Sequence, residues 1–313
     1  MKVFITGGAG FIGSHVAERL LAQGDEVLVI DNYETGRRDN LTPHPKLKVI
    51  EGDICDLEPL RKMTAEFKPD LCLHAAASYK DPENWSGDAR TNTFGTANVC
   101  TALKESGCPR ILYLQTALCY GLKPLEQPIT LDHPILPEGT SYSISKTAGE
   151  QYIKLSGLDW ASFRLANAYG PRNLSGPLPT FFHRLTTGKP CFVMNTRRDF
   201  IFVDDLVDCL MHAISGKGHG AYHISSGSDF SIKELFDETV AALAITLEKP
   251  VEERERNPDD AFTILLDPSR TINEFGWKVS TKLKDGVART ITWYHTHGIT
   301  QTFTHLKLPD QKG

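Results

Sequence analysis

The sequence of 313 residues predicts an α/β fold built on a doubly wound parallel sheet. Short apolar segments typical of buried strands alternate with longer segments whose apolar residues recur at helical spacing. A glycine-rich turn at residues 7–13 joins the first of these strands to the first helix. The alternation loosens after about residue 167, which predicts a second, smaller lobe.

The expected elements can be placed along the chain from these patterns. Strands are expected at residues 2–6, 26–30, 47–50, 71–75, 110–115 and 160–165. Helices are expected at residues 11–23, 57–67, 88–106 and 140–156, with two more at about 204–215 and 231–245. We therefore divide the chain into a domain of residues 1–166 and a lobe of residues 167–313, with right-handed crossovers and chain crossings between the two.

The glycine-rich turn has the spacing of a dinucleotide-binding loop. Gly7 permits a tight turn, Gly10 lets the backbone approach a pyrophosphate, and Gly13 lets the helix pack closely on the strand. The N–H groups at Phe11 and Ile12, where the helix begins, are expected to face the phosphates. This strand, turn and helix together predict a Rossmann-type domain.

The second strand is followed by a carboxylate, Asp31, and then Asn32. A carboxylate there accepts hydrogen bonds from the adenosine ribose and repels a 2′-phosphate, so it favours NAD over NADP. Arg37 and Arg38 could instead seat a 2′-phosphate, although a solvated or pyrophosphate-side position is favoured while Asp31 is present. The alternative for the whole motif is a glycine turn beside a surface aspartate.

Composition excludes several classes of protein. The formal net charge of −5 argues against a nucleic-acid surface. No apolar stretch approaches the roughly 20 residues of a membrane span, and the first strand begins at Lys2, so no signal peptide is expected. The seven cysteines lack CxxC pairing and predict reduced, mostly packed thiols in a cytoplasmic protein. Cys119 could be reactive, but a small core residue is the favoured interpretation.

Further candidate residues follow the carboxyl ends of the next strands, where ligands bind in parallel sheets. Asp53 and Ile54 could hold the adenine. His74, Ala75 and Ala76 provide small residues on which a cofactor could lie flat against the backbone. For the His74 side chain itself, a packed structural role is favoured over a catalytic one.

Tyr142 and Lys146 lie one helical turn apart and therefore face the same side. A tyrosine with its ordinary pKa of about 10 is a poor base at neutral pH. A nearby ammonium and a positive nicotinamide ring both favour the phenolate and lower that pKa. The phenolate can then take the proton of a sugar hydroxyl while hydride leaves the same carbon for NAD⁺.

Two more residues complete this predicted catalytic set. Thr116, at the end of a strand, is expected to hydrogen-bond the same substrate oxygen. Lys146 is also expected to bind the nicotinamide ribose. Asn92 lies on an intervening helix and is expected to contribute to the cofactor site. A YxxxK motif is common by chance, but its combination with the glycine turn, Thr116 and Asn92 is not.

These motifs resemble those of the extended short-chain dehydrogenases/reductases of the nucleotide-sugar epimerase/dehydratase family, over essentially the full chain. The matching runs are GGAGFIGSH (7–15), Asp31-Asn32, GDI (52–54), HAAA (74–77), TNTFGT (91–96), Thr116 with Tyr120-Gly121, YSISK (142–146), FRLANAYGPR (163–172), RRDFIFVDDL (197–206) and LDPSR with FGW (266–277). The runs QTALCYG, GPLPTFF and HLKL look most like nucleotide-sugar epimerases of bacterial O-antigen clusters.

The resemblance implies an isomerase that keeps NAD tightly bound. Sugar 4,6-dehydratases typically carry Thr-Asp-Glu where this chain has Thr116-Ala117-Leu118, and related decarboxylases keep the Glu. Without an acid and base there, oxidation and re-reduction at one carbon remain. The expected activity is therefore 4-epimerisation of a UDP-hexose or UDP-hexuronic acid through a transient 4-keto sugar, for polysaccharide biosynthesis.

The resemblance also implies substrate contacts. Asn167 matches a residue that touches the sugar diphosphate, and Arg198 and Arg256 match arginines that bind the nucleotide, a role suited to guanidinium groups. Surface salt bridges to Asp199, Asp259 or Asp260 are the alternative for the two arginines. The remaining candidates are Leu178, Thr180 and Phe181, which could shape a base pocket, and Lys80, which could favour an acidic sugar.

Two loops depart from or vary within the family pattern. The segment Val193–Arg197 is short and lacks glycine, which leaves the choice between UDP and another carrier open. The loop at residues 78–85 contains Tyr79, Lys80 and Trp85, which either set sugar specificity or form an aromatic lid.

The sequence leaves two alternative functions open and predicts one partner, a second copy of the chain. An NAD(P)H-dependent 4-keto-sugar nucleotide reductase is the alternative enzyme, against which Asp31 argues. A dinucleotide-sensing regulator is the alternative outside enzymes, against which the complete set Thr116, Tyr142 and Lys146 argues. The family resemblance implies a homodimer through the helices at 88–106 and 140–156.

Overall fold

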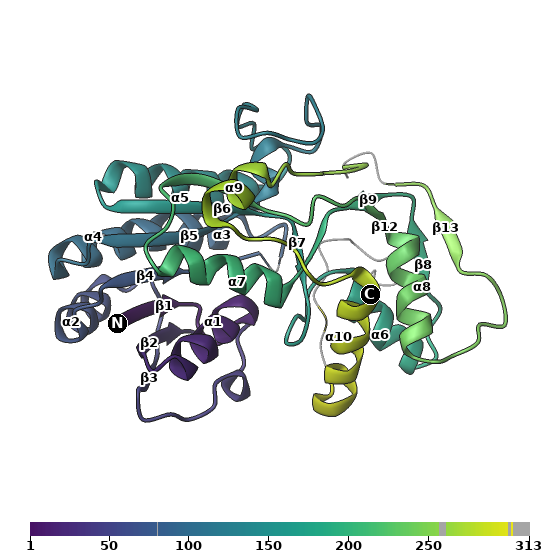
Figure 1. Cartoon of the computed structure of the whole chain (residues 1–313), viewed down its shortest axis with the longest axis horizontal. Helices are drawn as coiled ribbons and strands as arrows, with labels where there is room; N and C mark the ends of the chain where they lie inside the picture. Colours follow the sequence, from purple (N-terminus) through teal and green to yellow (C-terminus); the bar gives the residue numbers. More distant parts are fainter. Residues whose placement is uncertain (80, 257–260, 300–301, 303–313) are drawn as a thin grey trace.

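The computed structural model of the chain describes residues 1–79, 81–256, 261–299 and 302. Its centre is a parallel sheet of seven strands in the order β11-β6-β5-β4-β1-β2-β3 (Figure 1). The strands are β1 (Lys2–Thr6), β2 (Glu26–Asp31), β3 (Leu47–Glu51), β4 (Leu71–His74), β5 (Arg110–Thr116), β6 (Asp159–Leu165) and β11 (Gly220–Ile224). The predicted doubly wound sheet is therefore confirmed.

Helices cover both faces of this sheet, because successive residues of a strand point to opposite faces. On β1, Val3 and Ile5 join one apolar core, whereas Phe4 joins the other. The first core includes residues of α1 (Phe11–Ala22) and α7 (Val203–Ile214); the second includes residues of α2 (Leu57–Phe67), α4 (Thr96–Ser106) and α5 (Ser141–Ser156). Burial on both faces explains why β1, β2 and β4 are nearly continuous apolar runs, whereas the edge strand β3 is partly exposed.

The strand order reverses between β1 and β4. The chain runs outward from β1 through β2 to β3 and then returns to β4 on the other side of β1. In open parallel sheets, ligands bind in the crevice beyond the carboxyl ends of the strands at such a reversal. Gly7 lies against the chain that leaves β4 there, since a Cβ on Gly7 would be 2.7 Å from the backbone nitrogen of Ala76.

Three short strand pairs and a group of helices follow residue 166. The strand pairs are β7 (Asn167–Tyr169) with β10 (Phe200–Phe202), β9 (Arg197–Arg198) with β12 (Phe230–Ser231), and β8 (Phe192–Met194) with β13 (Glu252–Arg254). The helices α6 (Pro177–Thr186), α8 (Ile232–Ala242) and α10 (Leu283–His297) pack together beside them, away from the central sheet (Figure 1).

The chain crosses back to the central sheet within this second half. The strand β11 pairs with β6, α7 packs on α1, and α9 (Ser269–Phe275) packs on β11. The division of the chain into two domains at residue 166 stays a prediction.

Several elements differ from the sequence-based expectation. The helix expected at 88–106 consists of α3 (Trp85–Asp88), a π-helical segment (Ala89–Gly95) and α4. The helix expected at 231–245 ends at Ala242. The strand β11 was not predicted, because it has five residues that include Gly220 and His223. The helices α6, α9 and α10 were not predicted either, since their apolar residues are interrupted by proline, glycine or threonine.

The cysteines are mostly packed in the core, as expected from the sequence. All seven cysteines are free, and all except Cys191 are buried. Within the described part of the chain, no helix combines the length and the apolar character that a membrane crossing requires.

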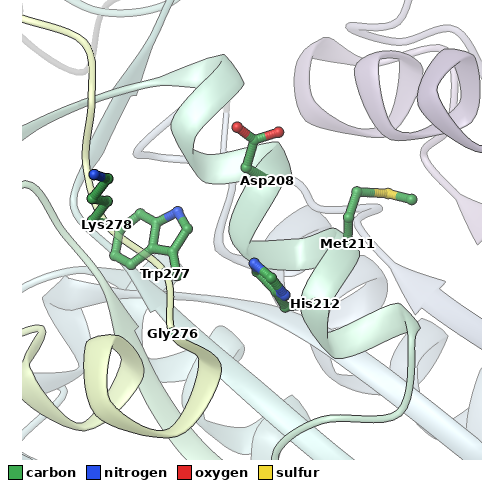
Figure 2. A pocket seen from close by; sticks show the side chains of 6 residues that line it. All are labelled: Asp208, Met211, His212, Gly276, Trp277 and Lys278. Atoms are coloured by element: carbon green, nitrogen blue, oxygen red, sulfur yellow. The ribbon is translucent and has the colours of Figure 1, made fainter.

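A buried carboxylate on α7 holds the chain that follows α9. Asp205 is 1% exposed and accepts hydrogen bonds from the backbone and hydroxyl of Ser280 (3.1 and 2.6 Å) and from the backbone of Thr281 (3.0 Å). The indole of Trp277 donates to the Asp205 carbonyl (2.8 Å). Trp277 also lines the shallow hollow in Figure 2, between α7 and residues 276–278.

We expect Asp205→Ala to lower the free energy of unfolding by about 2 to 4 kcal/mol, because it removes three hydrogen bonds that Ser280 and Thr281 donate to a buried carboxylate. Asp208→Ala on the same helix is the matched control, since Asp208 is half exposed and pairs with Arg19 on the surface. That variant should lose less than about 1 kcal/mol. Urea unfolding measures both, and equal losses would contradict the anchoring role of Asp205.

Candidate active site

The turn between β1 and α1 leaves no room for side chains. Gly7 has a left-handed backbone (φ 67°), and a Cβ on Gly13 would lie 2.4 Å from the Gly7 carbonyl oxygen. Gly10 caps α1 without a side-chain hydrogen bond, so the first N–H groups of the helix, at Phe11 and Ile12, lack a side-chain partner there. Such a helix terminus fits a phosphate group.

Asp31 is held at the end of β2 beside this turn. It accepts hydrogen bonds from the backbone N–H groups of Ala9 (2.9 Å) and Tyr33 (2.8 Å). Burial raises the pKa of Asp31, and these hydrogen bonds oppose that shift. Asn32 is exposed beside it. The carboxylate therefore lies where a ribose would meet the glycine turn, and the donor set fits a dinucleotide.

The two arginines that could have seated a 2′-phosphate make ion pairs with carboxylates. Arg37 pairs with Asp39 (2.5 Å), and Arg38 pairs with Glu51 (2.6 Å). Their charges are therefore already compensated, which agrees with the preference for a cofactor without that phosphate.

Residues after β3 and β4 frame the same crevice. Asp53 accepts from the backbone of Cys55 (2.9 Å) and pairs with Arg90 (3.2 Å), while Ile54 is buried below the π-helical segment. After β4, Ala75 and Ala76 are partly exposed at the crevice.

The His74 side chain is packed in the core. Its two ring nitrogens lie 2.6 Å from the Thr6 hydroxyl and 2.9 Å from the Thr96 hydroxyl, and burial lowers its pKa to about 3. The interpretation of His74 as a structural histidine is confirmed, and any contact with a cofactor would involve its backbone.

Asn92 joins the loop after β4 to α5. Its amide accepts from the Ser78 backbone N–H (2.9 Å) and donates to the Ser78 carbonyl (2.9 Å) and the Ser145 hydroxyl (3.0 Å). Ser145 in turn donates to the Tyr142 carbonyl (3.0 Å). Asn92 lies in the π-helical segment, a local geometry that often accompanies functional sites.

The N-terminus of α5 places Tyr142 and Lys146 on one side. Thr140 caps the helix by accepting from the Ser143 N–H (3.1 Å). Lys146 is 1% exposed, and its Nζ lies 4.0 Å from the centre of the Tyr113 ring. The Lys146 carbonyl accepts from the Tyr113 hydroxyl (3.0 Å), which ties α5 to β5.

A glycine permits this close approach of α5. A Cβ on Gly149 would lie 2.5 Å from the Asn92 carbonyl oxygen and 2.8 Å from the Tyr113 hydroxyl. Any side chain at this position would therefore push α5, and with it Tyr142, away from the π-helical segment.

Burial shifts both predicted catalytic groups toward their neutral forms. It raises the pKa of Tyr142, and the charges of Tyr79 and Asp88 add to that shift. It lowers the pKa of Lys146 to about 7, partly offset by Glu150. We expected Lys146 to lower the pKa of Tyr142. In the chain without a cofactor the pKa of Tyr142 is instead raised, because the effect of desolvation is the largest.

Thr116 ends β5 on the same edge of the sheet. Its hydroxyl accepts from the Leu118 N–H (3.1 Å), which leaves the hydroxyl proton for a substrate oxygen. Ala117 and Leu118 form the following turn. Cys119 is fully buried and its pKa is raised to about 12, so the expected core role is confirmed.

Two of the predicted substrate residues lie together around Asp199. The backbone and side-chain N–H groups of Asn167 donate to the Asp199 carbonyl (2.9 and 3.3 Å). The adjacent Arg198 donates to the carbonyls of Arg197 (2.7 Å) and Ala261 (2.9 Å).

The other substrate candidates are spread along the second half. Leu178 is buried in the core, Thr180 donates to the Gly176 carbonyl (2.9 Å) on the first turn of α6, and Arg256 is exposed after β13. Phe181 is also buried in the core. Lys80, Asp259 and Asp260 lie outside the described residues.

Four residues that position the catalytic side chains were not predicted from the sequence. Ser78, Tyr113 and Ser145 act through hydrogen bonds to Asn92 or to the backbone of α5, and Gly149 acts through its lack of a side chain. No motif spacing singles out such residues. The hollow in Figure 2 shares none of its six lining residues with the predicted site, so we assign it no part in the chemistry.

Comparisons with known proteins agree with this geometry. The model of the NAD dependent epimerase/dehydratase family matches residues 3–225. A crystal structure of the Bordetella bronchiseptica enzyme WbmH in complex with NAD⁺ is 52% identical, has a TM-score of 0.92, and covers 95% of this chain and 99% of that one. The enzyme WbmG from the same organism, in complex with NAD and UDP, is 44% identical with a TM-score of 0.90, and covers 98% of this chain and 99% of that one.

Two of the relatives have names that state different activities. The UDP-glucose 4-epimerase of Mycolicibacterium smegmatis is 31% identical over 94% of this chain and 98% of its own length. UDP-glucuronic acid decarboxylase 6 of Arabidopsis thaliana is 32% identical over 92% of this chain and 87% of its own length.

The lowered pKa of Lys146 makes a pH-dependent stability difference that can be measured. Above pH 7, Lys146 has lost its proton in the folded chain but keeps it in the unfolded chain. The free energy of unfolding therefore rises with pH, until the pH reaches the ordinary lysine pKa of 10.5. Relative to Lys146→Met, wild-type protein freed of dinucleotide should gain about 1.4 kcal/mol per pH unit between pH 7 and 9. Urea unfolding at both pH values tests this, and an unchanged difference would contradict it.

Proposed function

The chain belongs to the NAD-dependent epimerase/dehydratase family, and we propose that it is a nucleotide-sugar 4-epimerase. Its substrate would be a UDP-hexose or UDP-hexuronic acid, which passes through a transient 4-keto sugar. The proposal draws on the residues after β5 and on the groups gathered at the carboxyl edge of the sheet.

One observation favours epimerisation over dehydration or decarboxylation. The turn after Thr116 begins with Ala117 and Leu118, whose side chains can neither donate nor accept a proton, and its other two residues, Cys119 and Tyr120, are fully buried. Elimination of water or loss of a carboxylate would need an acid or base beside the sugar in addition to Tyr142. With Thr116, Tyr142 and Lys146 as the available groups, oxidation and re-reduction at a single carbon is the chemistry that remains.

The dinucleotide site supports a resident NAD. The open turn at Gly7 to Gly13, the N-terminus of α1 and the carboxylate of Asp31 fit the pyrophosphate and the adenosine ribose. When bound there, NAD would supply the redox chemistry as the acceptor and donor of a hydride at the sugar carbon.

The chain supplies the proton transfer and the positioning. Tyr142 takes the proton of the 4-hydroxyl group and returns it after the keto sugar has turned its other face to the cofactor. Thr116 donates a hydrogen bond to the same oxygen and so fixes its distance from Tyr142. Lys146 is placed to bind the nicotinamide ribose, and Asn92 holds α5 against the loop after β4.

The proposed substrate is supported by the similarity to enzymes named for UDP-sugars and by two residues of this chain. Relatives named for UDP-sugars, together with WbmG in complex with UDP, favour a uridine nucleotide carrier. Asn167 and Arg198 are the groups that we assign to its diphosphate, from the family resemblance, with Arg256, Leu178 and Thr180 as further candidates. Lys80 would act on the sugar.

A panel of UDP-sugars tests the proposal directly. The purified protein is incubated with each sugar nucleotide without added cofactor, and the products are separated by chromatography. A 4-epimer of one substrate, formed without net consumption of NAD, is the expected result. A requirement for added NADPH would instead indicate a keto-sugar reductase, and release of carbon dioxide would indicate a decarboxylase.

Tyr142→Phe should lower kcat by about 10² to 10⁴, because it removes the group that moves the proton. The ring contact with Tyr79 is kept, so bound NAD and the unfolding midpoint should stay near those of the wild type. Tyr152→Phe, on the exposed side of the same helix, is the matched control and should keep full activity. Wild-type turnover by Tyr142→Phe would refute the proton-transfer role.

The exposed side of α5 also favours a homodimer. Ile144 (55% exposed) and Leu155 (79% exposed) lie on one stripe of this helix with Ala148 and Gln151, at helical spacing, and Phe94 is exposed on the adjoining π-helical segment. An apolar stripe of this kind on a surface helix indicates a protein interface. We propose that two copies of the chain pair through α4 and α5.

Leu155→Glu should convert the dimer to a monomer, since two carboxylates would be buried in the symmetric interface. Leu125→Glu is the matched control, because Leu125 is 74% exposed and belongs to the loop before Pro128, outside α4 and α5. Light scattering after size-exclusion chromatography measures both. An unchanged mass for Leu155→Glu would rule out this interface.

A further inference from the structure

A polar side chain interrupts the apolar interior of β5 next to the catalytic edge of the sheet. Gln115 is 2% exposed and follows the buried residues 111–114. A buried amide is costly unless its polar ends have hydrogen-bond partners. Its oxygen accepts from the Thr116 N–H (2.8 Å), and its nitrogen donates to the Lys146 carbonyl (3.1 Å). This amide, the Gln115 bridge, therefore joins the backbones of two residues of the predicted catalytic set.

The two partners fix the orientation of the Gln115 amide. A backbone N–H only donates and a carbonyl oxygen only accepts. A rotated amide would therefore place its NH₂ group against the Thr116 N–H and its oxygen against the Lys146 carbonyl, and both contacts would be repulsive. The Gln115 bridge thus has a single arrangement, and a shorter or apolar side chain breaks it.

The same face of β5 holds α5 at one carbonyl group. Residues 113 and 115 point to one side of the sheet, because side chains alternate along a strand. The Tyr113 hydroxyl donates to the Lys146 carbonyl (3.0 Å), which also accepts from the Gln115 amide. Tyr113 therefore fastens α5 to the strand, whereas Gln115 also binds the backbone N–H at which the strand ends.

The Gln115 bridge restricts the separation of two hydroxyl groups that would share one substrate oxygen. Tyr142 lies one helical turn before Lys146, so its position follows that of the Lys146 backbone. The Thr116 hydroxyl accepts from the Leu118 N–H (3.1 Å), so its position follows that of the end of β5. A link between the Lys146 carbonyl and the Thr116 N–H therefore limits how far the two hydroxyls can move apart.

We propose that Gln115 is a positioning residue, which holds Thr116 and Tyr142 at the separation that proton transfer requires. This inference rests on the proposed function, in which both hydroxyls contact the same sugar oxygen. A displacement of about 1 Å can lower a rate by on the order of 10². The proposed contacts to the nucleotide lie on other elements, so loss of the Gln115 bridge should lower kcat and leave KM nearly unchanged.

Gln115→Met tests this role, because it keeps the length of the side chain and removes both hydrogen bonds. We expect kcat to fall about ten- to hundredfold, with KM for the sugar nucleotide within about twofold of the wild-type value. Gln115→Asn keeps the amide but is one methylene shorter, so it cannot reach both partners and should show the same loss. If Gln115→Met fails to fold, Gln115→Asn decides the test.

Two comparisons separate positioning from a general loss of hydrogen bonds. The exposed Gln127 amide also joins two backbone groups, since it donates to the Thr263 carbonyl (2.9 Å) and accepts from the Leu265 N–H (2.7 Å). Gln127→Met is therefore the matched control and should keep the kcat of the wild type. In a Thr116→Val background, Gln115→Met should lower kcat by less than about twofold, because the hydroxyl that it positions is gone.

Wild-type kcat in the Gln115 variants, a rise in KM alone, or an undiminished loss in the Thr116→Val background would each overturn the proposal. A crystal structure of the Gln115→Met holoprotein gives a readout without turnover. The distance between the Thr116 and Tyr142 hydroxyls should differ from that in the wild type by about 0.5 Å or more, and an unchanged distance would overturn the proposal. A wild type that converts no sugar nucleotide would refute the proposed function, while this distance would still decide the role of Gln115.

Discussion

The close contact between α5 and the π-helical segment is the constraint on which the site depends. Gly149 allows it, and the Asn92 amide uses it to bond both Ser145 on α5 and Ser78 after β4. Tyr142 and Lys146 are therefore located relative to the crevice by backbone packing and by one amide group. A shift of about 1 Å in such a helix would misplace the proton-transferring group relative to its substrate.

Burial sets the resting state of this site as strongly as geometry does. Both Tyr142 and Lys146 are shifted toward their uncharged forms in the chain itself. A desolvated phenol keeps its proton until a positive charge arrives beside it. The oxidised nicotinamide ring would bring that charge, so proton removal would be coupled to the presence of the cofactor in its oxidised form.

Sequence patterns predicted the sheet, its helical layers and the candidate catalytic residues. Apolar strands and the glycine turn are local signals, so β1 to β6 and α1 could be placed without a structure. The strand β11 and the π-helical segment could not, because they depend on contacts with distant segments. His74 was recognised as a packed residue and Tyr79 as part of a distinctive loop, whereas Ser78 has no signal of its own in the sequence and became informative only through its partners.

The return of β11 to the central sheet has a consequence for how the chain could be divided. A fragment that stopped after β6 would expose the hydrogen-bonding groups of that strand along its whole outer edge. Such an uncovered border is a template for pairing with other molecules, so the fragment would tend to aggregate. Synthesis must therefore reach residue 224 before the sheet is complete, which makes the later half of the chain a structural requirement of the earlier one.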